Sequence, residues 1–108
     1  MALMLFSGPF VDCKSSPSDS TPDYAGNVQT TRSGKTCQRW DSQTPHAPNV
    51  GLVVAGNFPD SSVSDAGNSC RNLDNDGNGP WCYTTDPNTR WENCDIPLCS
   101  SMFYIQQQ

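Results

Sequence analysis

The sequence has few of the aliphatic residues that ordinarily build a hydrophobic core. Leu, Ile, Val and Phe together number only 17 of the 108 residues, and the formal net charge is -5. Low hydrophobicity combined with net charge is typical of disordered chains, so something other than a large core must hold this one together. The length allows one domain and is too short for two ordinary ones.

Basic residues and long apolar runs are also scarce. Six scattered Lys and Arg residues in an acidic chain argue against nucleic-acid binding. No segment approaches the ~20 apolar residues that cross a bilayer, which excludes a transmembrane segment from the sequence. The initial run MALMLF lacks a basic leading region and is shorter than the roughly 7–15 residues of a signal-peptide core. Together with the apolar tail at 102–105, it leads us to expect a fragment of a longer protein.

The sequence has six cysteines, which can stabilise the fold in place of a large aliphatic core. An even number of cysteines in a small, polar chain rich in Pro and Gly predicts a disulfide framework and therefore an extracellular, secreted protein. Each bridge that closes a long loop stabilises the fold by roughly 3–5 kcal/mol in the chain-entropy account. Six cysteines allow fifteen pairings, and their spacing alone does not choose among them. They are Cys13, Cys37, Cys70, Cys82, Cys94 and Cys99.

The stretch DNDGNG at 74–79 looks like the start of a calcium loop. Asp74, Asp76 and Asn78 stand where an EF-hand places its first oxygen ligands. The closing position is Thr85, which does not chelate, and neither flank has the apolar period of a helix. An ordinary acidic turn is therefore favoured, and a calcium site is kept as the third hypothesis for this chain, with no metal ligand assigned.

The clearest strands are expected at 81–85 and 89–93, joined by a short turn at 86–88. If Cys82 and Cys94 point inward, alternation places three aromatic side chains together on the outer face: Trp81, Tyr83 and Trp91. An exposed apolar trough of this kind is seldom left unused. The alternative interpretation is that another loop covers these rings and that they form the missing core.

Catalytic chemistry finds little support in the sequence. His46 is the only histidine, without a second histidine or a C-x-x-C pair, and is interpreted as a loop residue rather than a metal ligand or base. No serine has an assembled base beside it, so we expect no enzyme activity, no catalytic residue and no cofactor. Trp40 and Tyr24 lie among turns near Cys37 and are expected to pack in the core.

Four segments carry a resemblance to a known family. They are DYAGN at 23–27, TRSGKTCQRW at 31–40, CRNLDNDGNGPWCYTTDP at 70–87 and RWENCDIPLC at 90–99. With the cysteine spacing, they resemble a kringle domain spanning 13–99, with a flexible segment at 1–12 and a tail at 100–108. The resemblance implies a small disulfide-rich fold, mostly irregular with short antiparallel strands. It also implies the pairs Cys13–Cys99, Cys37–Cys82 and Cys70–Cys94.

The resemblance further implies a ligand site like that of the lysine-binding kringles, such as those of plasminogen. In those domains an acidic pair receives the ammonium of a lysine, aromatic rings line its methylenes and an arginine meets its carboxylate. A lysine needs this combination because it carries a point charge on a four-carbon stem. The matching positions here are Asp74, Asp76, Trp81, Tyr83, Arg90 and Trp91.

Two departures bear on that site. Leu73 stands where the family usually has proline, so the acidic loop is expected to be less rigid. The long segment between Cys37 and Cys70 offers HAPNVGLVV without Lys or Arg, so carboxylate recognition would rest on Arg90. Strict alternation also places Arg90 opposite Trp91, and both reach one ligand only if the strand twists or ends there.

The sequence therefore predicts an extracellular protein-binding module that recognises an exposed, C-terminal lysine on a partner protein, within a larger multidomain protein. The competing interpretation is a kringle that serves as a structural spacer or docking surface of a larger protease, growth factor or receptor, without lysine binding.

Overall fold

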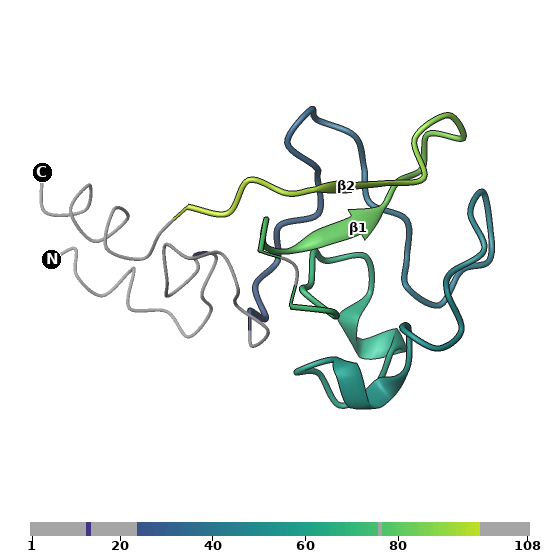
Figure 1. Cartoon of the computed structure of the whole chain (residues 1–108), viewed down its shortest axis with the longest axis vertical. Coiled ribbons are helices and arrows are strands. Elements are labelled where there is room, and N and C mark those ends of the chain that lie inside the picture. The colour runs from purple at the N-terminus through teal and green to yellow at the C-terminus, as the bar shows by residue number, and fades with distance from the viewer. Residues whose placement is uncertain (1–12, 14–23, 76, 98–108) are drawn as a thin grey trace, which may run out of the picture.

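A computed structural model of the chain describes residues 13, 24–75 and 77–97. Regular structure is sparse in these ranges, as the many turn signals of the sequence predict. In chain order the elements are η1 Ala55–Asn57, η2 Ser64–Ala66, β1 Trp81–Tyr83 and β2 Trp91–Asn93. Figure 1 shows β1 and β2 side by side, with the two 3-10 helices (teal) on one side of them. No helix in the described ranges has the length and apolar content to cross a bilayer.

The predicted antiparallel strand pair is confirmed, but each strand is two residues shorter than expected. Tyr83 pairs with Trp91, so residues 84–90 form the connection. Thr84 ends β1 because its hydroxyl is used in the turn, where it donates to the carbonyl of Thr89 and accepts from the amide of Asp86. The connection is therefore a loop braced by one threonine side chain rather than a minimal hairpin turn.

Two disulfides join the segments around these strands. Cys37 bonds to Cys82 of β1, and Cys70 bonds to Cys94 directly after β2, as the family resemblance implied. The two bridges lie against each other, with the Sγ atoms of Cys37 and Cys70 3.7 Å apart. They close loops with sequence separations of 45 and 24 residues, which greatly restricts the unfolded chain. The third implied pair, Cys13–Cys99, stays a prediction, because Cys99 lies outside the described residues.

Aromatic rings form the centre of the core. Trp40 is 1% exposed and packs edge-on against Phe58, Trp81 and Tyr83, with ring centroids 5.3–5.8 Å apart. Its indole N–H donates to the carbonyl of Ser69 at 2.7 Å, so its polar end is also satisfied. Edge-to-face pairs of this kind add ~0.5–1.5 kcal/mol each beyond their area burial. The aromatic residues therefore supply the core that the few aliphatic residues do not, and the predicted burial of Trp40 is confirmed.

A buried ion pair holds three further segments together. The guanidinium of Arg71, which is 3% exposed, donates from Nε to Oδ2 of Asp60 at 2.9 Å. Its Nη1 donates to the carbonyl of Gly26, and its Cζ lies 5.7 Å from the ring centroid of Tyr24. Tyr24 is itself buried, as predicted. Since a buried charge is tolerated only when it is paired and hydrogen-bonded, these contacts fix the 24–26 and 58–60 segments against residue 71.

Candidate functional site

A pocket of about 240 Å³ lies where the β1–β2 pair meets the loop at 49–52. It combines side chains from four separate parts of the chain, two of them carrying opposite charges. Its lining is Asn49, Leu52, Asp74, Trp81, Tyr83, Arg90 and Trp91. Five of the six predicted ligand-binding residues therefore meet at one pocket, while the sixth, Asp76, lies outside the described residues.

Two rings from β1 form the inner wall of this pocket. Residue alternation places Trp81 and Tyr83 on the same side of the strand, away from the disulfide of Cys82. They are only 5% and 3% exposed, so the prediction that they face outward is wrong. Trp40 packs against both rings, and the amide of Asn49 donates to the Tyr83 hydroxyl at 3.1 Å. Core packing and the 49–52 loop thus leave only part of each ring to line the pocket.

Trp91 differs from the other two rings because it is half exposed. It lies at the start of β2 and pairs with Tyr83 in the sheet register. Its ring packs edge-on against Trp81 at 6.0 Å, while 50% of the residue remains accessible. Trp91 is the one of the three predicted aromatics that does face outward, and it forms the outer wall of the pocket.

Asp74 supplies the negative charge. It is exposed, and its Oδ1 accepts a hydrogen bond from the indole N–H of Trp81 at 3.1 Å. Within the described ranges no Lys or Arg forms an ion pair with it. Leu73, immediately before it, is 8% exposed and belongs to the core, so it anchors the start of the acidic loop through packing. The indole contact orients the carboxylate while leaving its charge available to a ligand.

Arg90 supplies the positive charge. Its guanidinium carbon lies 5.0 Å from the centroid of the Tyr83 ring, a cation–π geometry. The alternation that separated Arg90 from Trp91 does not apply, because β2 begins at Trp91 and Arg90 belongs to the preceding connection. Among the residues that the structure describes, no acidic group pairs with this guanidinium. The described lining of the pocket therefore carries the carboxylate of Asp74 and the guanidinium of Arg90, and neither forms an ion pair with the other or with another described side chain.

Sequence reasoning missed Asn49 and Leu52. Their segment was noted only for its lack of Lys and Arg, and no apolar period marks it as part of a site. Its position follows from the hydrogen bond between Asn49 and Tyr83, which joins residues 34 positions apart in the chain. No sequence signal predicts such a contact. In the structure Leu52 adds an apolar wall to the pocket.

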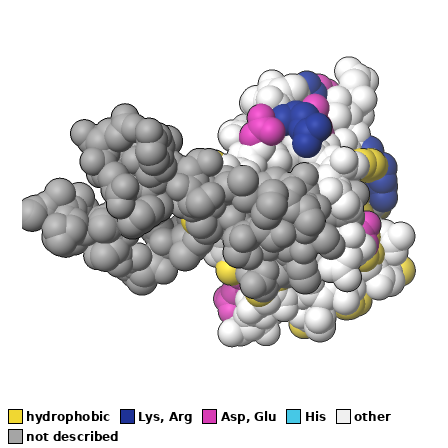
Figure 2. Space-filling model, turned by 60° about the vertical axis from the view of Figure 1, so that its left-hand side comes forward, with side chains coloured by type: hydrophobic (Ala, Val, Ile, Leu, Met, Phe, Trp, Pro, Cys, Tyr) yellow, Lys and Arg dark blue, Asp and Glu magenta, His cyan; other side chains and the backbone are white. Residues whose placement is uncertain are grey.

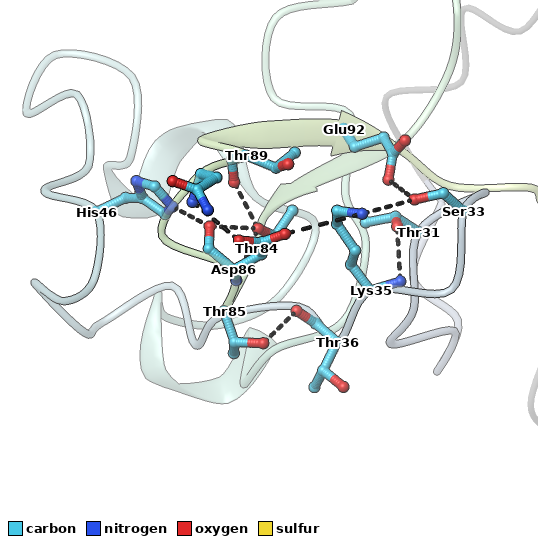
Figure 3. Close-up of polar contacts among 11 residues, drawn as sticks. Thr31, Ser33, Lys35, Thr36, His46, Thr84, Thr85, Asp86, Thr89 and Glu92 are labelled. Carbon is cyan, nitrogen blue, oxygen red and sulfur yellow. Dashed lines mark hydrogen bonds and ion pairs between the residues drawn. The ribbon is translucent and has the colours of Figure 1, made fainter.

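His46 has a structural role. Its ring Nε2 lies 2.9 Å from the carbonyl of Asp86, so this nitrogen carries the proton and donates it (Figure 3). Its backbone amide and carbonyl both bond to the side chain of Gln38, at 3.1 and 2.8 Å. These contacts place His46 in a loop, as predicted, and dock that loop on the turn leading to Arg90.

The cysteine sulfurs are the group that most resembles a metal site in the described ranges. Four of them lie within 4.8 Å of one another. All four belong to the two disulfides, so none is available as a thiolate ligand. Asp76, on which the calcium hypothesis depends, lies outside the described residues.

Charged side chains are mixed on the face shown in Figure 2. There Lys and Arg lie beside Asp and Glu rather than in a broad basic patch. Among the described residues, Arg39 and Asp41 form an exposed ion pair, with Nε and Oδ1 2.9 Å apart.

Comparison with known protein families agrees with this architecture. The Kringle domain model matches residues 17–99. The matched stretch contains both observed disulfides and every described residue of the pocket.

Proposed function

Because the chain belongs to the kringle family of non-catalytic protein-binding modules, we propose that it binds an exposed, C-terminal lysine of a partner protein. Disulfide-bonded kringle domains are typically extracellular, and we place this chain among secreted proteins. Such modules usually occur in multidomain proteins, and we propose the same setting here.

One observation carries the proposal: a carboxylate and a guanidinium, neither in an ion pair with any described residue, line a single aromatic pocket. Asp74 is suited to the lysine ammonium and Arg90 to the terminal carboxylate. Between them, Trp81 and Trp91 offer apolar surface for the four methylenes of the stem. A C-terminal lysine carries this same order of charge, apolar stem and opposite charge.

The expected affinity is modest. Both charges are near the surface, so salt partly screens their attraction for a ligand. A single module should bind in the micromolar range or more weakly, and tight binding to a partner would require several linked modules. Wild-type affinity should fall as ionic strength rises.

A purely structural or docking role is the second candidate. The observation that favours it is the deep burial of Trp81 and Tyr83, at 5% and 3% exposure. Packing against Trp40 is a sufficient reason for both rings to be aromatic. In that case the domain would act through other parts of its surface, and the pocket would have no ligand.

Titration of the oxidised chain with ε-aminocaproate, followed by tryptophan fluorescence, separates these candidates. The decisive variant is Asp74→Asn, which removes the charge but keeps a side-chain oxygen for the Trp81 indole. Loss of a charge-assisted hydrogen bond worth about 1.5–3 kcal/mol should weaken binding by about one to two orders of magnitude. Asp65→Asn is the matched control, since Asp65 is exposed in η2 and does not line the pocket.

Saturable binding that is lost in Asp74→Asn and kept in Asp65→Asn would support the lysine site. A flat response from the correctly bridged wild-type chain would refute it and leave the structural role. The double variant Asp74→Asn/Asp76→Asn then tests the contribution that the family resemblance assigns to Asp76.

A further inference from the structure

A second hollow, of about 320 Å³, lies beside the lysine pocket. Its apolar lining comes from the buried Trp40, from the loop at 48–53 and from a residue next to η2. These apolar residues are Trp40, Pro48, Val50, Val53 and Val63, and the polar residues of the lining are Asp41, Gln43 and Asn49. The lysine proposal makes no use of this hollow.

Asn49 lines both hollows, so the two share one lining residue. Its amide donates to the Tyr83 hydroxyl, and its Oδ1 accepts from the amide of Gly51 at 2.9 Å. Its carbonyl accepts from the amides of Leu52 and Val53, at 3.1 and 2.9 Å. This hydrogen-bonded turn presents Leu52 to the lysine pocket and Val53 to the second hollow. One rigid turn therefore makes the two hollows neighbours.

The second hollow offers no unpaired charge among its described lining residues. Asp41 also lines it, but its carboxylate accepts two hydrogen bonds from Arg39, from Nε to Oδ1 at 2.9 Å and from Nη2 to Oδ2 at 3.1 Å. The same contacts lower the pKa of Asp41. The other lining side chains are neutral, and Val50 is 88% exposed. The chemistry of this hollow thus suits an uncharged aliphatic side chain better than a second lysine.

We propose that the second hollow binds an aliphatic side chain of the same polypeptide whose lysine enters the first pocket. The inference rests on the proposed lysine function. Because the two hollows share Asn49, a polypeptide whose lysine fills the first pocket has its neighbouring residues close to the second hollow. Once the lysine is bound, the neighbouring side chain is held at high local concentration. Burying it against Val50 and Val53 should then raise affinity by roughly tenfold.

The test uses the oxidised full chain and synthetic peptides that end in a free C-terminal lysine. Each peptide carries an acetylated leucine upstream, separated from the lysine by zero to three glycines, and each has a twin with alanine in place of leucine. Calorimetric titration compares every pair, and ε-aminocaproate reports the lysine pocket separately. At the spacing that spans Asn49, the leucine peptide should bind about tenfold more tightly than its alanine twin.

Two valine variants locate the effect. Val50→Ser should abolish the advantage of leucine and leave ε-aminocaproate affinity unchanged, since Val50 does not line the lysine pocket. Val54→Ser is the matched control, because Val54 is also exposed and lines neither hollow. The control should keep the advantage. Both substitutions are at exposed side chains, so neither should prevent folding.

The outcomes are distinguishable. Equal binding of leucine and alanine peptides at all four spacings, with normal ε-aminocaproate binding, would overturn the second subsite and leave the lysine function standing. If the leucine peptide lost its tighter binding in Val54→Ser but kept it in Val50→Ser, the leucine would not bind in the second hollow. If neither peptides nor ε-aminocaproate bind, the lysine function fails, and the subsite that rests on it fails as well.

Discussion

The indole N–H of Trp81 donates to Oδ1 of Asp74 at 3.1 Å, so a buried core residue orients an exposed acidic one. This contact joins the aromatic core to the acidic loop. It also implies that the charge of Asp74 and its hydrogen bond are separable by mutation.

Asp74→Ala and Asp74→Asn should therefore differ in stability. Asn keeps an acceptor for the Trp81 indole, whereas Ala leaves that N–H without one. We expect Asp74→Ala to lose about 0.5–1.5 kcal/mol relative to Asp74→Asn in urea unfolding with the disulfides intact. Equal midpoints and slopes for the two variants would show that the hydrogen bond contributes nothing to stability.

Arg90→Gln should weaken binding only of ligands that carry a carboxylate. The guanidinium stacks on Tyr83 at the pocket, whereas the ammonium of the ligand is assigned to Asp74. Affinity for ε-aminocaproate should fall by roughly tenfold or more, as a charge-assisted contact is lost. Affinity for pentylamine, which lacks the carboxylate, should remain as in the wild type.

Arg32→Gln is the control for this change, because Arg32 is exposed and does not line the pocket. If Arg90→Gln weakened both ligands equally, Arg90 would have no specific role toward the carboxylate.

Trp91 should dominate the collisional quenching of fluorescence. It is 50% exposed, whereas Trp40 and Trp81 are 1% and 5% exposed. Acrylamide should therefore quench one accessible fraction, which disappears in Trp91→Phe. Saturating ε-aminocaproate should shield that fraction in the wild type. Undiminished quenching at saturation would place the ligand away from Trp91.

Breaking the Arg71–Asp60 pair should be strongly destabilising. Arg71→Met leaves Asp60 without its partner in a partly buried setting, at an expected cost of about 3–5 kcal/mol in the free energy of unfolding. Urea denaturation of the oxidised wild-type and Arg71→Met chains measures this loss in the free energy of unfolding. Replacing both residues with apolar ones should recover much of the loss.

Arg39→Met is the matched control, since it breaks the exposed Arg39–Asp41 pair and should cost less than about 1 kcal/mol. Similar losses for the two arginine variants would contradict the role assigned to Arg71.

Glu92 should make stability depend on pH in the acid range. Hydrogen bonds from Thr31 and Ser33 lower its pKa, and the charge of Lys35 adds to the effect. Figure 3 shows the contact with Ser33. A carboxyl with a lower pKa in the folded state stabilises the fold above its unfolded pKa of about 4.3. That contribution is lost as pH falls through the lower folded pKa. Glu92→Gln should flatten this part of the stability profile.

Ser33→Ala should weaken the same pH dependence, because the Ser33 hydroxyl donates to Oε1 of Glu92 at 2.7 Å. Ser61→Ala, at an exposed position away from Glu92, should leave it unchanged. An unaltered acid profile in Glu92→Gln would show that another group controls this range.

Local patterns in the sequence were enough to predict the frame of this domain. The alternation in 81–93 predicted the antiparallel pair, because side-chain period and turn residues act over a few positions. The cysteines predicted a disulfide framework, and the kringle resemblance supplied the two pairings that the structure contains. Turn-rich surroundings likewise predicted the burial of Trp40.

Contacts between distant segments decided the rest. Alternation assigned Trp81 and Tyr83 to one side of β1. Only the folded chain brought Trp40 and Asn49 onto that side, where they bury the two rings. Arg90 reaches the pocket because β2 begins at Trp91, two residues later than predicted, which leaves Arg90 in the preceding connection. A strand pattern specifies which face a side chain occupies. What packs against that face depends on chain segments tens of residues away, and no local period encodes them.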